Sequence, residues 1–261
     1  MELTEAQAKF KADYIRDRGY WVEFNDGLLA YSPEFLQTYL RYAGQPARTG
    51  PLGARMRELI YIAIDASATH MFGEGLAIHM RGALASGASP RDIIETLQIA
   101  TAQGLDSVAL GVGILAEEMQ AAGHDTAFLQ APLSDEHARL KAAYVAHFGD
   151  WPEFCDRLLR FSPGYFEVMT ELLAAPAATS ALLAVERELI GIALNAALTQ
   201  MDAAELRLHM TRALRLGAAP ADILQVLQLT AHLGIHACVI GVPLMVAAID
   251  ARERAARERA A

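Results

Sequence analysis

An internal repeat with a constant offset of 130 residues is the feature of this sequence that most constrains its fold. The stretch RELIYIAIDASATHM at 57–71 returns as RELIGIALNAALTQM at 187–201. The stretch HMRGALASGASPRDIIETLQ at 79–98 returns as HMTRALRLGAAPADILQVLQ at 209–228. Because no insertion separates the matching stretches, the sequence predicts that one structural unit occurs twice in tandem.

Each copy of the repeat is predicted to be helical. Its apolar residues recur at spacings of three and four, and no alternating run indicates a strand. GASPRD and GAAPAD each place a Gly at the end of one helix and a Pro at the start of the next. Gly104 and Gly234 permit a break in the long apolar helices that follow. We therefore expect an all-α fold with roughly five or six helices in each of two domains, 1–130 and 131–261.

Composition indicates a globular protein of the cytoplasm. Hydrophobic residues make up 53% of the chain, and the net charge of −9 argues against nucleic acid or an anionic membrane as a partner. The longest apolar stretch, 239–249, is too short to span a bilayer, and the N-terminus lacks the apolar core of a signal peptide. Cys155 and Cys238 are far apart, which fits a reducing compartment.

A polar stripe marks one helix of the second copy. Glu205, His209 and Arg212 stand at i, i+4 and i+7, so they share one face. The first copy keeps only the histidine, His79, because glycines replace the other two residues. We therefore expect a functional site in the second copy, although both histidines could instead be buried groups that a neighbouring helix satisfies.

The preceding helix carries a repeated Arg–Glu pair, Arg187–Glu188 in the second copy. A carboxylate within an apolar helix needs a partner, because burying it unpaired is costly. An ion pair between Glu188 and an arginine is one interpretation. The other is that Glu188 orients His209 and sets its tautomer, while Arg187 or Arg212 anchors a substrate carboxylate.

His232 and His236 are a second pair of candidate site residues in the C-terminal half. They stand at i, i+4, and together with Glu205 and His209 they could bind a metal ion such as zinc. They could equally line a polar pocket that binds substrate. We expect no bound metal, and the metal site stays an alternative.

The two copies resemble the carboxymuconolactone decarboxylase family, which shares its all-α fold with alkyl hydroperoxidase D-like proteins. The string R-E-L-I, then E-L-R-L-H-M-x-x-A-L, a Gly and a helix that restarts at Pro-x-D-I carry the resemblance. It covers residues 57–113 and 187–243. Since such proteins assemble as trimers or hexamers of single units, the resemblance implies a homo-oligomer, with a trimer of fused pairs expected.

The sequence departs from the peroxidase branch of this fold. Those members carry a C-x-x-C motif ahead of the histidine, and the matching positions here are Phe72 and Gly75, then Asp202 and Glu205. Without a thiolate, no attack on a peroxide can occur at this site. Thiol peroxidase activity is therefore excluded there.

The resemblance implies a cofactor-free lyase of the carboxymuconolactone decarboxylase type, or a related isomerase or hydrolase, that acts on a small anionic lactone or unsaturated acid in the setting of aromatic compound degradation. Decarboxylation of such a compound needs a cation for the substrate, an apolar wall and a proton donor at carbon. We expect His209, tuned by Glu205 or Glu188, to be the donor. Met201, Leu208 and residues like Phe72 are candidates for the wall. The alternatives are a catalytically silent oligomeric protein that binds a small molecule, and a metal-dependent enzyme that uses His232 and His236.

Overall fold

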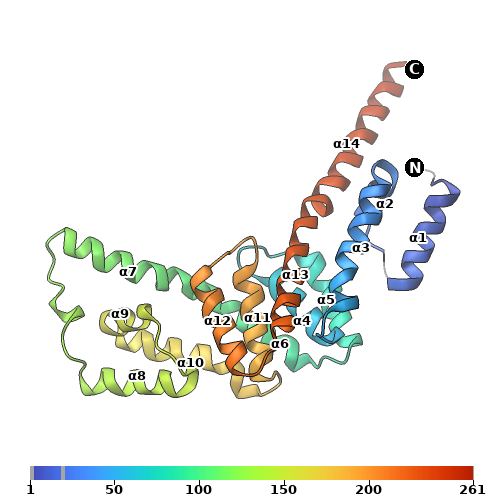
Figure 1. Cartoon of the computed structure of the whole chain (residues 1–261). Coiled ribbons are helices and arrows are strands. Elements are labelled where there is room, and N and C mark those ends of the chain that lie inside the picture. Colours follow the sequence, from blue (N-terminus) through green and yellow to red (C-terminus); the bar gives the residue numbers. More distant parts are fainter. Residues whose placement is uncertain (1–2, 19–20, 261) are drawn as a thin grey trace. The chain divides into compact units, whose positions relative to one another are not determined.

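The computed structural model describes residues 3–18 and 21–260, and every regular element in this part of the chain is a helix (Figure 1). The predicted all-α class is confirmed for the described residues. The helices group into two compact units. Unit 1 combines residues 1–51 with 231–261, and unit 2 comprises residues 52–230.

Unit 2 contains the central helices of both copies of the repeat. The first residues of its helices α4, α5 and α6 recur 130 residues later as the first residues of α11, α12 and α13. The unit consists of α4 (Ala54–Ala66), α5 (Gly73–Ala85), α6 (Pro90–Thr101), η1 (Ala102–Leu105), α7 (Asp106–Ala121), η2 (Ala127–Leu129), α8 (Asp135–Phe148), α9 (Glu153–Phe161), α10 (Pro163–Thr179), α11 (Ala184–Ala196), α12 (Ala203–Arg215) and α13 (Pro220–Thr230).

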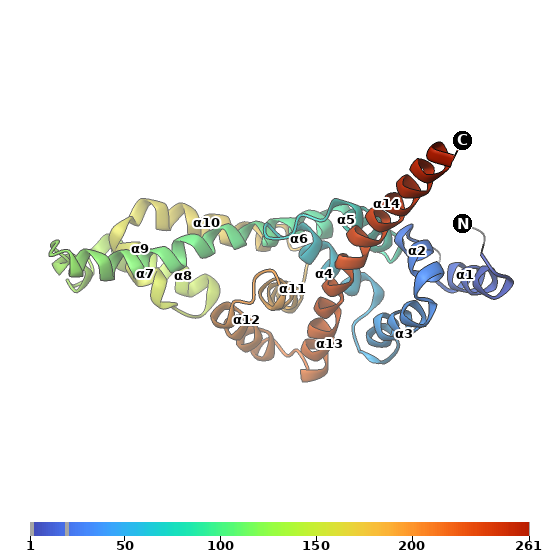
Figure 2. The same cartoon turned by 90° about the horizontal axis from the view of Figure 1, so that it is seen from above.

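The core of unit 2 is built on the apolar helices α4 and α11, which pack against each other. Each is also covered by the next two helices of its own copy, and α11 and α12 lie side by side in Figure 2. The side chains of Ile60, Ile62, Ile190 and Ile192 are fully buried. The hydroxyls of Thr69 and Thr199, which the offset relates to each other, lie 3.0 Å apart. The two copies therefore contact each other through equivalent residues at this point.

The Gly–Pro segments form the helix boundaries that the sequence predicts. Gly87 and Gly217 adopt positive φ angles of 89° and 93°, a left-handed conformation that ends the preceding helix and favours glycine. At the start of α6, Ser89 accepts a hydrogen bond from the Asp92 N–H, and the Asp92 carboxylate accepts one from the Ser89 N–H. This reciprocal capping fixes the point at which α6 begins.

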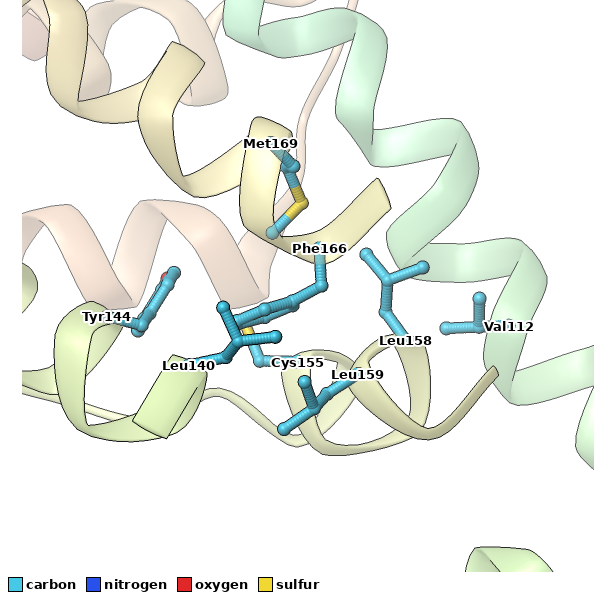
Figure 3. Packing of buried hydrophobic residues seen from close by; sticks show 8 residues of the cluster. All are labelled: Val112, Leu140, Tyr144, Cys155, Leu158, Leu159, Phe166 and Met169. Carbon is cyan, nitrogen blue, oxygen red and sulfur yellow. The ribbon is translucent and has the colours of Figure 1, made fainter. Parts of the chain in front are cut away.

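The last helix of the first copy packs on the first helices of the second. Within unit 2, α7 contacts α9. Figure 3 shows the buried cluster there, in which Val112 of α7 joins apolar side chains of α8, α9 and α10, with Phe166 among them. The last helix of the first copy thus completes a buried apolar cluster of the second copy.

In unit 1 the last helix of the second copy packs in the same way on the helices at the start of the first copy. Unit 1 consists of α1 (Glu5–Arg18), α2 (Phe24–Tyr31), α3 (Pro33–Thr49), η3 (Ala231–Ile235) and α14 (His236–Ala260). The final helix, α14, packs on α2, where Gly27 has no side chain and Val242 fills the space that a Cβ atom would occupy. Each compact unit therefore combines parts of both copies, so the predicted boundary near residue 130 delimits the sequence repeat and not a compact unit.

Each copy has seven α-helices in the described residues, not five or six. The extra helix arises because the long apolar segment after each Pro is interrupted by a 3₁₀ turn, η1 or η3, at the position of Gly104 or Gly234. Counted through these turns, the segments 90–121 and 220–260 are long and apolar enough to cross a membrane by length and composition alone. The expectation drawn from residues 239–249 therefore underestimated the apolar length.

A fully buried carboxylate connects the two copies inside unit 2. Glu95 of α6 accepts hydrogen bonds from Arg187 Nη1 at 2.8 Å and from the N–H groups of Ala181 and Leu182, which precede α11. At the matching position of the second copy, the Gln225 amide oxygen accepts a bond from the Leu52 N–H. Both helices therefore hold the start of a central helix of the other copy, but only Glu95 does so with a charge.

We predict that Glu95→Ala lowers the free energy of unfolding by about 3–5 kcal/mol, because it leaves the Arg187 guanidinium without its charged partner and two backbone N–H groups without their acceptor. Gln225→Ala is the matched control and should cost about 1–3 kcal/mol, since it removes a neutral acceptor. Urea unfolding followed by circular dichroism measures both values. Equal losses in the two variants would contradict a charge-dependent contact.

Candidate functional site

Unit 2 contains a cavity of about 510 Å³ beside the polar stripe of α12. The first copy contributes the end of α6, η1 and the start of α7, and the second contributes α8, α9, α10, α11 and α12. The ionisable lining residues are Asp106, Tyr144, His147, Arg187, Glu188, Glu205, His209, Arg212 and Arg215. Apolar side chains such as Phe148, Leu172 and Leu208 complete the wall, so the cavity has the mixed character of a small-molecule site.

His209 and Glu188 form a hydrogen-bonded pair at the cavity. The Nδ1 atom of His209 lies 2.7 Å from Glu188 Oε2. The imidazole packs on the backbone of Gly191, where an added Cβ atom would lie 2.4 Å from Nδ1. Among the described residues no hydrogen-bond partner contacts Nε2, so this nitrogen remains for a ligand. The structure therefore has the arrangement in which Glu188 orients His209, and not the alternative pair between Glu188 and an arginine.

Arg212 lies at the cavity wall and is held by a carboxylate that the sequence analysis did not single out. Its Nε and Nη2 atoms donate to the two oxygens of Asp150, each at 2.6 Å. Burial is the largest single influence and opposes the charge, but the hydrogen bonds to Asp150 together with the charges of Glu188 and Asp150 raise the pKa of Arg212 above its usual value. The guanidinium also lies over the Phe148 ring. Since Nη1 takes no part in the Asp150 pair, Arg212 is a fixed cation with N–H groups to spare.

Arg187 also lines the cavity, but its Nη1 donates to Glu95 and to the carbonyl of Leu182. The structure thus gives this residue a role in joining the two copies, which the sequence did not predict. Arg215 is a further cation at the cavity, with its side chain 54% exposed, and was missed because it lies outside the i, i+4, i+7 stripe.

Two carboxyl groups at the cavity hold their protons more tightly than usual. Burial raises the pKa of Glu205, against the opposing effect of the charges on His209 and Arg212. Burial also raises the pKa of Asp106 to about 6, with repulsion from Glu205 and Asp202 adding to the effect. Glu205 makes no side-chain hydrogen bond to His209 in the described structure, so Glu188 is the direct partner of the imidazole.

The structure does not place His232 and His236 among the residues that line this cavity. They belong to η3 and α14 of unit 1, where the His232 ring lies 5.2 Å from the Tyr42 ring. Their first-copy counterparts, Ala102 and Asp106, line the cavity instead. The first copy therefore forms the side of the cavity opposite α12, although α12 belongs to the second copy. The spacing of the two histidines could not reveal which copy forms that side.

The prediction of which apolar residues line the cavity is only partly correct. Leu208 lines the cavity, but Met201 and Phe72 do not. Met201 is 72% exposed, because it lies in the turn before α12 with a positive φ angle of 51°. Its side chain therefore points to solvent.

The first copy keeps the histidine–carboxylate pair but not its surroundings. His79 Nδ1 lies 2.8 Å from Glu58 Oε2, as in the second copy. Tyr61, which occupies the position of Gly191, stacks on the His79 ring with centroids 4.4 Å apart. At Gly75, a Cβ atom would lie 2.3 Å from the buried Asp65 carboxylate, and at Gly82 it would lie 2.7 Å from Glu58. Side chains like those of Glu205 and Arg212 therefore do not fit the first copy.

We predict that Gly191→Ala displaces the His209 ring and costs about 1–3 kcal/mol of stability, because the new methyl group overlaps the imidazole. A crystal structure of the variant shows the ring position, and thermal unfolding gives the cost. Gly53→Ala is the control, since a Cβ atom there meets nothing within 4 Å. An unmoved His209 ring at full stability would contradict the close packing.

Asp65 gives a second prediction, on stability against pH. Its Oδ2 atom is buried without a hydrogen-bond partner among the described residues, and burial raises its pKa to about 6. Because this value exceeds that of the unfolded chain, the wild type loses stability as the pH rises from about 4 to about 6. Asn195 occupies the matching position and donates to the Gly191 carbonyl, so Asp65→Asn should be accommodated.

At about pH 8 the Asp65→Asn variant is expected to exceed the wild type in unfolding free energy by on the order of 2–3 kcal/mol, and at about pH 4 by little. Urea titrations at both pH values measure the difference. A gain of the same size at both would show that the charge of Asp65 is not the cause.

Comparisons with known proteins agree with this geometry. The sequence model of the carboxymuconolactone decarboxylase family matches residues 33–118. A crystal structure from Burkholderia xenovorans LB400, provisionally described as a gamma-carboxymuconolactone decarboxylase subunit, is 30% identical with a TM-score of 0.89. The match covers 94% of this chain and 98% of that one. Comparison with curated proteins gave no match. By its fold and its likeness to a relative over nearly the full length of both chains, this protein belongs to the carboxymuconolactone decarboxylase family.

Proposed function

We propose that this protein is a cofactor-free carboxy-lyase that releases CO2 from a small anionic lactone or a related unsaturated acid. The observation that carries the proposal is the His209–Glu188 pair at a cavity of about 510 Å³, in a chain of the carboxymuconolactone decarboxylase family. The Burkholderia relative, described as a decarboxylase subunit, supports the same reaction class.

Binding of the anionic substrate depends on arginine. Arg212 and Arg215 present guanidinium groups to the cavity, and Asp150 fixes the first of them in place. A carboxylate that does not react binds to the remaining N–H groups of Arg212, which orients the lactone. Arg187 adds positive potential, while its hydrogen bonds keep it at Glu95.

Loss of CO2 is assisted by the apolar part of the wall. Phe148, Leu172 and Leu208 keep water away from the carboxylate that reacts. Loss of this hydration favours conversion of the charged carboxylate to neutral CO2. The carbon–carbon bond to CO2 breaks, and its electron pair spreads over the conjugated lactone as a dienolate. Because this conjugation accepts the electrons, the proposed reaction requires no organic cofactor or metal.

His209 then completes the reaction as a general acid. Its protonated imidazole donates the Nε2 proton to carbon, and a proton from solvent restores it afterwards. Glu188 accepts the Nδ1–H bond, which stabilises the imidazolium and orients the ring. One proton is consumed for each CO2 released.

We further propose that the protein works as a homo-oligomer, with a trimer of fused pairs expected. Large apolar side chains are exposed on α7 of unit 2, where Leu110 is 69% exposed, and on α14 of unit 1, where Leu244 is 66% exposed. Subunit contacts are a common role of such exposed apolar faces. Sedimentation equilibrium distinguishes the trimer from a monomer.

The direct test is CO2 release from gamma-carboxymuconolactone, the compound named for the relative. We predict that His209→Gln lowers kcat by about 10²–10⁴-fold, because it removes the general acid. The matched control, His79→Gln, changes the equivalent residue of the first copy and should remain within a few-fold of the wild type. Circular dichroism checks that both variants are folded.

Two outcomes would contradict the proposal. Equal losses in His209→Gln and His79→Gln would assign no special role to the second copy. Tight binding of the lactone by the wild type without turnover would favour a small-molecule-binding protein that lacks lyase activity.

A further inference from the structure

Asp106 is a cavity residue for which the proposed reaction has so far no use. It is the first residue of α7 and directly follows the 3₁₀ turn η1, so the first copy presents it to the site of the second. The second copy has a histidine, His236, at the matching position. Asp106 thus lines the cavity that also contains Glu205, His209 and Arg212, and the second copy has no carboxylate at the matching position.

A single hydrogen bond orients the Asp106 carboxyl group. The side-chain amide of Gln200, in the loop between α11 and α12, donates to Asp106 Oδ2. No described residue donates to Oδ1, and Oδ1 is not among the buried atoms that lack a partner. One oxygen is therefore held by the protein and the other is left for a ligand in the cavity.

The charged groups around Asp106 disfavour its ionised form. Asp202, at the start of α12, and Glu205 of the same helix repel a negative charge on Asp106, whereas His209 attracts it. The other titratable or charged groups of the cavity come from α8, α11 and α12: Tyr144, His147, Arg187, Glu188, Arg212 and Arg215. Burial is the largest cause of the raised pKa of about 6, so the acid form persists to much higher pH than in an exposed aspartate.

We propose that Asp106 is a second catalytic residue, whose protonated carboxyl group donates a hydrogen bond to the lactone carbonyl oxygen on which negative charge develops. This inference rests on the proposed lyase function and narrows its substrate to compounds with a carbonyl group conjugated to the carbon that loses CO2. A neutral carboxylic acid in a partly buried site is a strong donor to an enolate oxygen.

The proton count of the reaction stays balanced. As the bond to CO2 breaks, its electron pair moves through the conjugated system to the carbonyl oxygen, and Asp106 stabilises that oxygen without giving up its proton. When His209 protonates the carbon, the electrons return from the oxygen and the hydrogen bond weakens. Asp106 therefore ends the cycle as it began.

The test compares Asp106→Asn and Asp106→Ala in decarboxylation of gamma-carboxymuconolactone across pH. The alanine variant should lose about 10²–10³-fold in kcat, as for loss of one donor to an oxyanion. The asparagine variant keeps an N–H donor and should retain more activity. Its rate should also lose the part of the decline with rising pH that the ionisation of Asp106 near pH 6 causes in the wild type.

Infrared difference spectra provide a readout that does not depend on activity. The wild type should show protonated carboxyl groups that titrate near pH 6, and Asp106→Asn should remove one of them. Asp65→Asn is the matched control, because the pKa of Asp65 is also about 6 and it does not line the cavity. It should remove the other infrared band and leave the rate profile unchanged.

The outcomes separate the two claims. If His209→Gln abolishes turnover while Asp106→Ala matches the wild type, the role of Asp106 is wrong and the lyase function stands. An unchanged pH profile or an unchanged infrared band in Asp106→Asn would also overturn this inference. If the wild type fails to decarboxylate the lactone, both proposals fail together.

Discussion

The buried contact between Glu95 and Arg187 is the interaction on which the cavity depends most. It fixes the start of α11 against α6, and Glu188 follows Arg187 directly in the chain. The position of Glu188 in turn sets the orientation of the His209 imidazole. Because α6 also continues into η1 and Asp106, one cross-copy ion pair aligns two opposite walls of the same site.

Duplication makes such an asymmetric site possible. In each compact unit, the last helix of one copy packs on the first helices of the other, and the cavity of unit 2 is lined by both copies. The second copy has a glycine at 191 and polar side chains at 205 and 212, which leave a charged cavity. The first copy has Tyr61 beside its histidine and glycines where polar side chains would clash. The first copy thus has a large residue where the second has Gly191, and it has glycines where the second has Glu205 and Arg212.

The helical class, the helix boundaries at Gly87 and Gly217, and the stripe on α12 could all be predicted from sequence, because they depend on local spacing and turn chemistry. The pair of Glu188 and His209 was one of two interpretations, since a pattern cannot say which partner a carboxylate finds. Asp150 and Asp106 were missed because they reach the cavity through tertiary packing. Their only sequence signal is asymmetry, since the offset of 130 residues pairs these two aspartates with a tyrosine and a histidine.

The central claim is that the chain has one working cavity, at His209. The most direct measurement is a crystal structure with a saturated lactone dicarboxylate, which lacks the conjugation needed to lose CO2. The account predicts one ligand per chain, in the cavity of unit 2, with an oxygen or ring atom within hydrogen-bond distance of His209 Nε2. A ligand bound beside His79, or an empty cavity at saturating concentration, would contradict it.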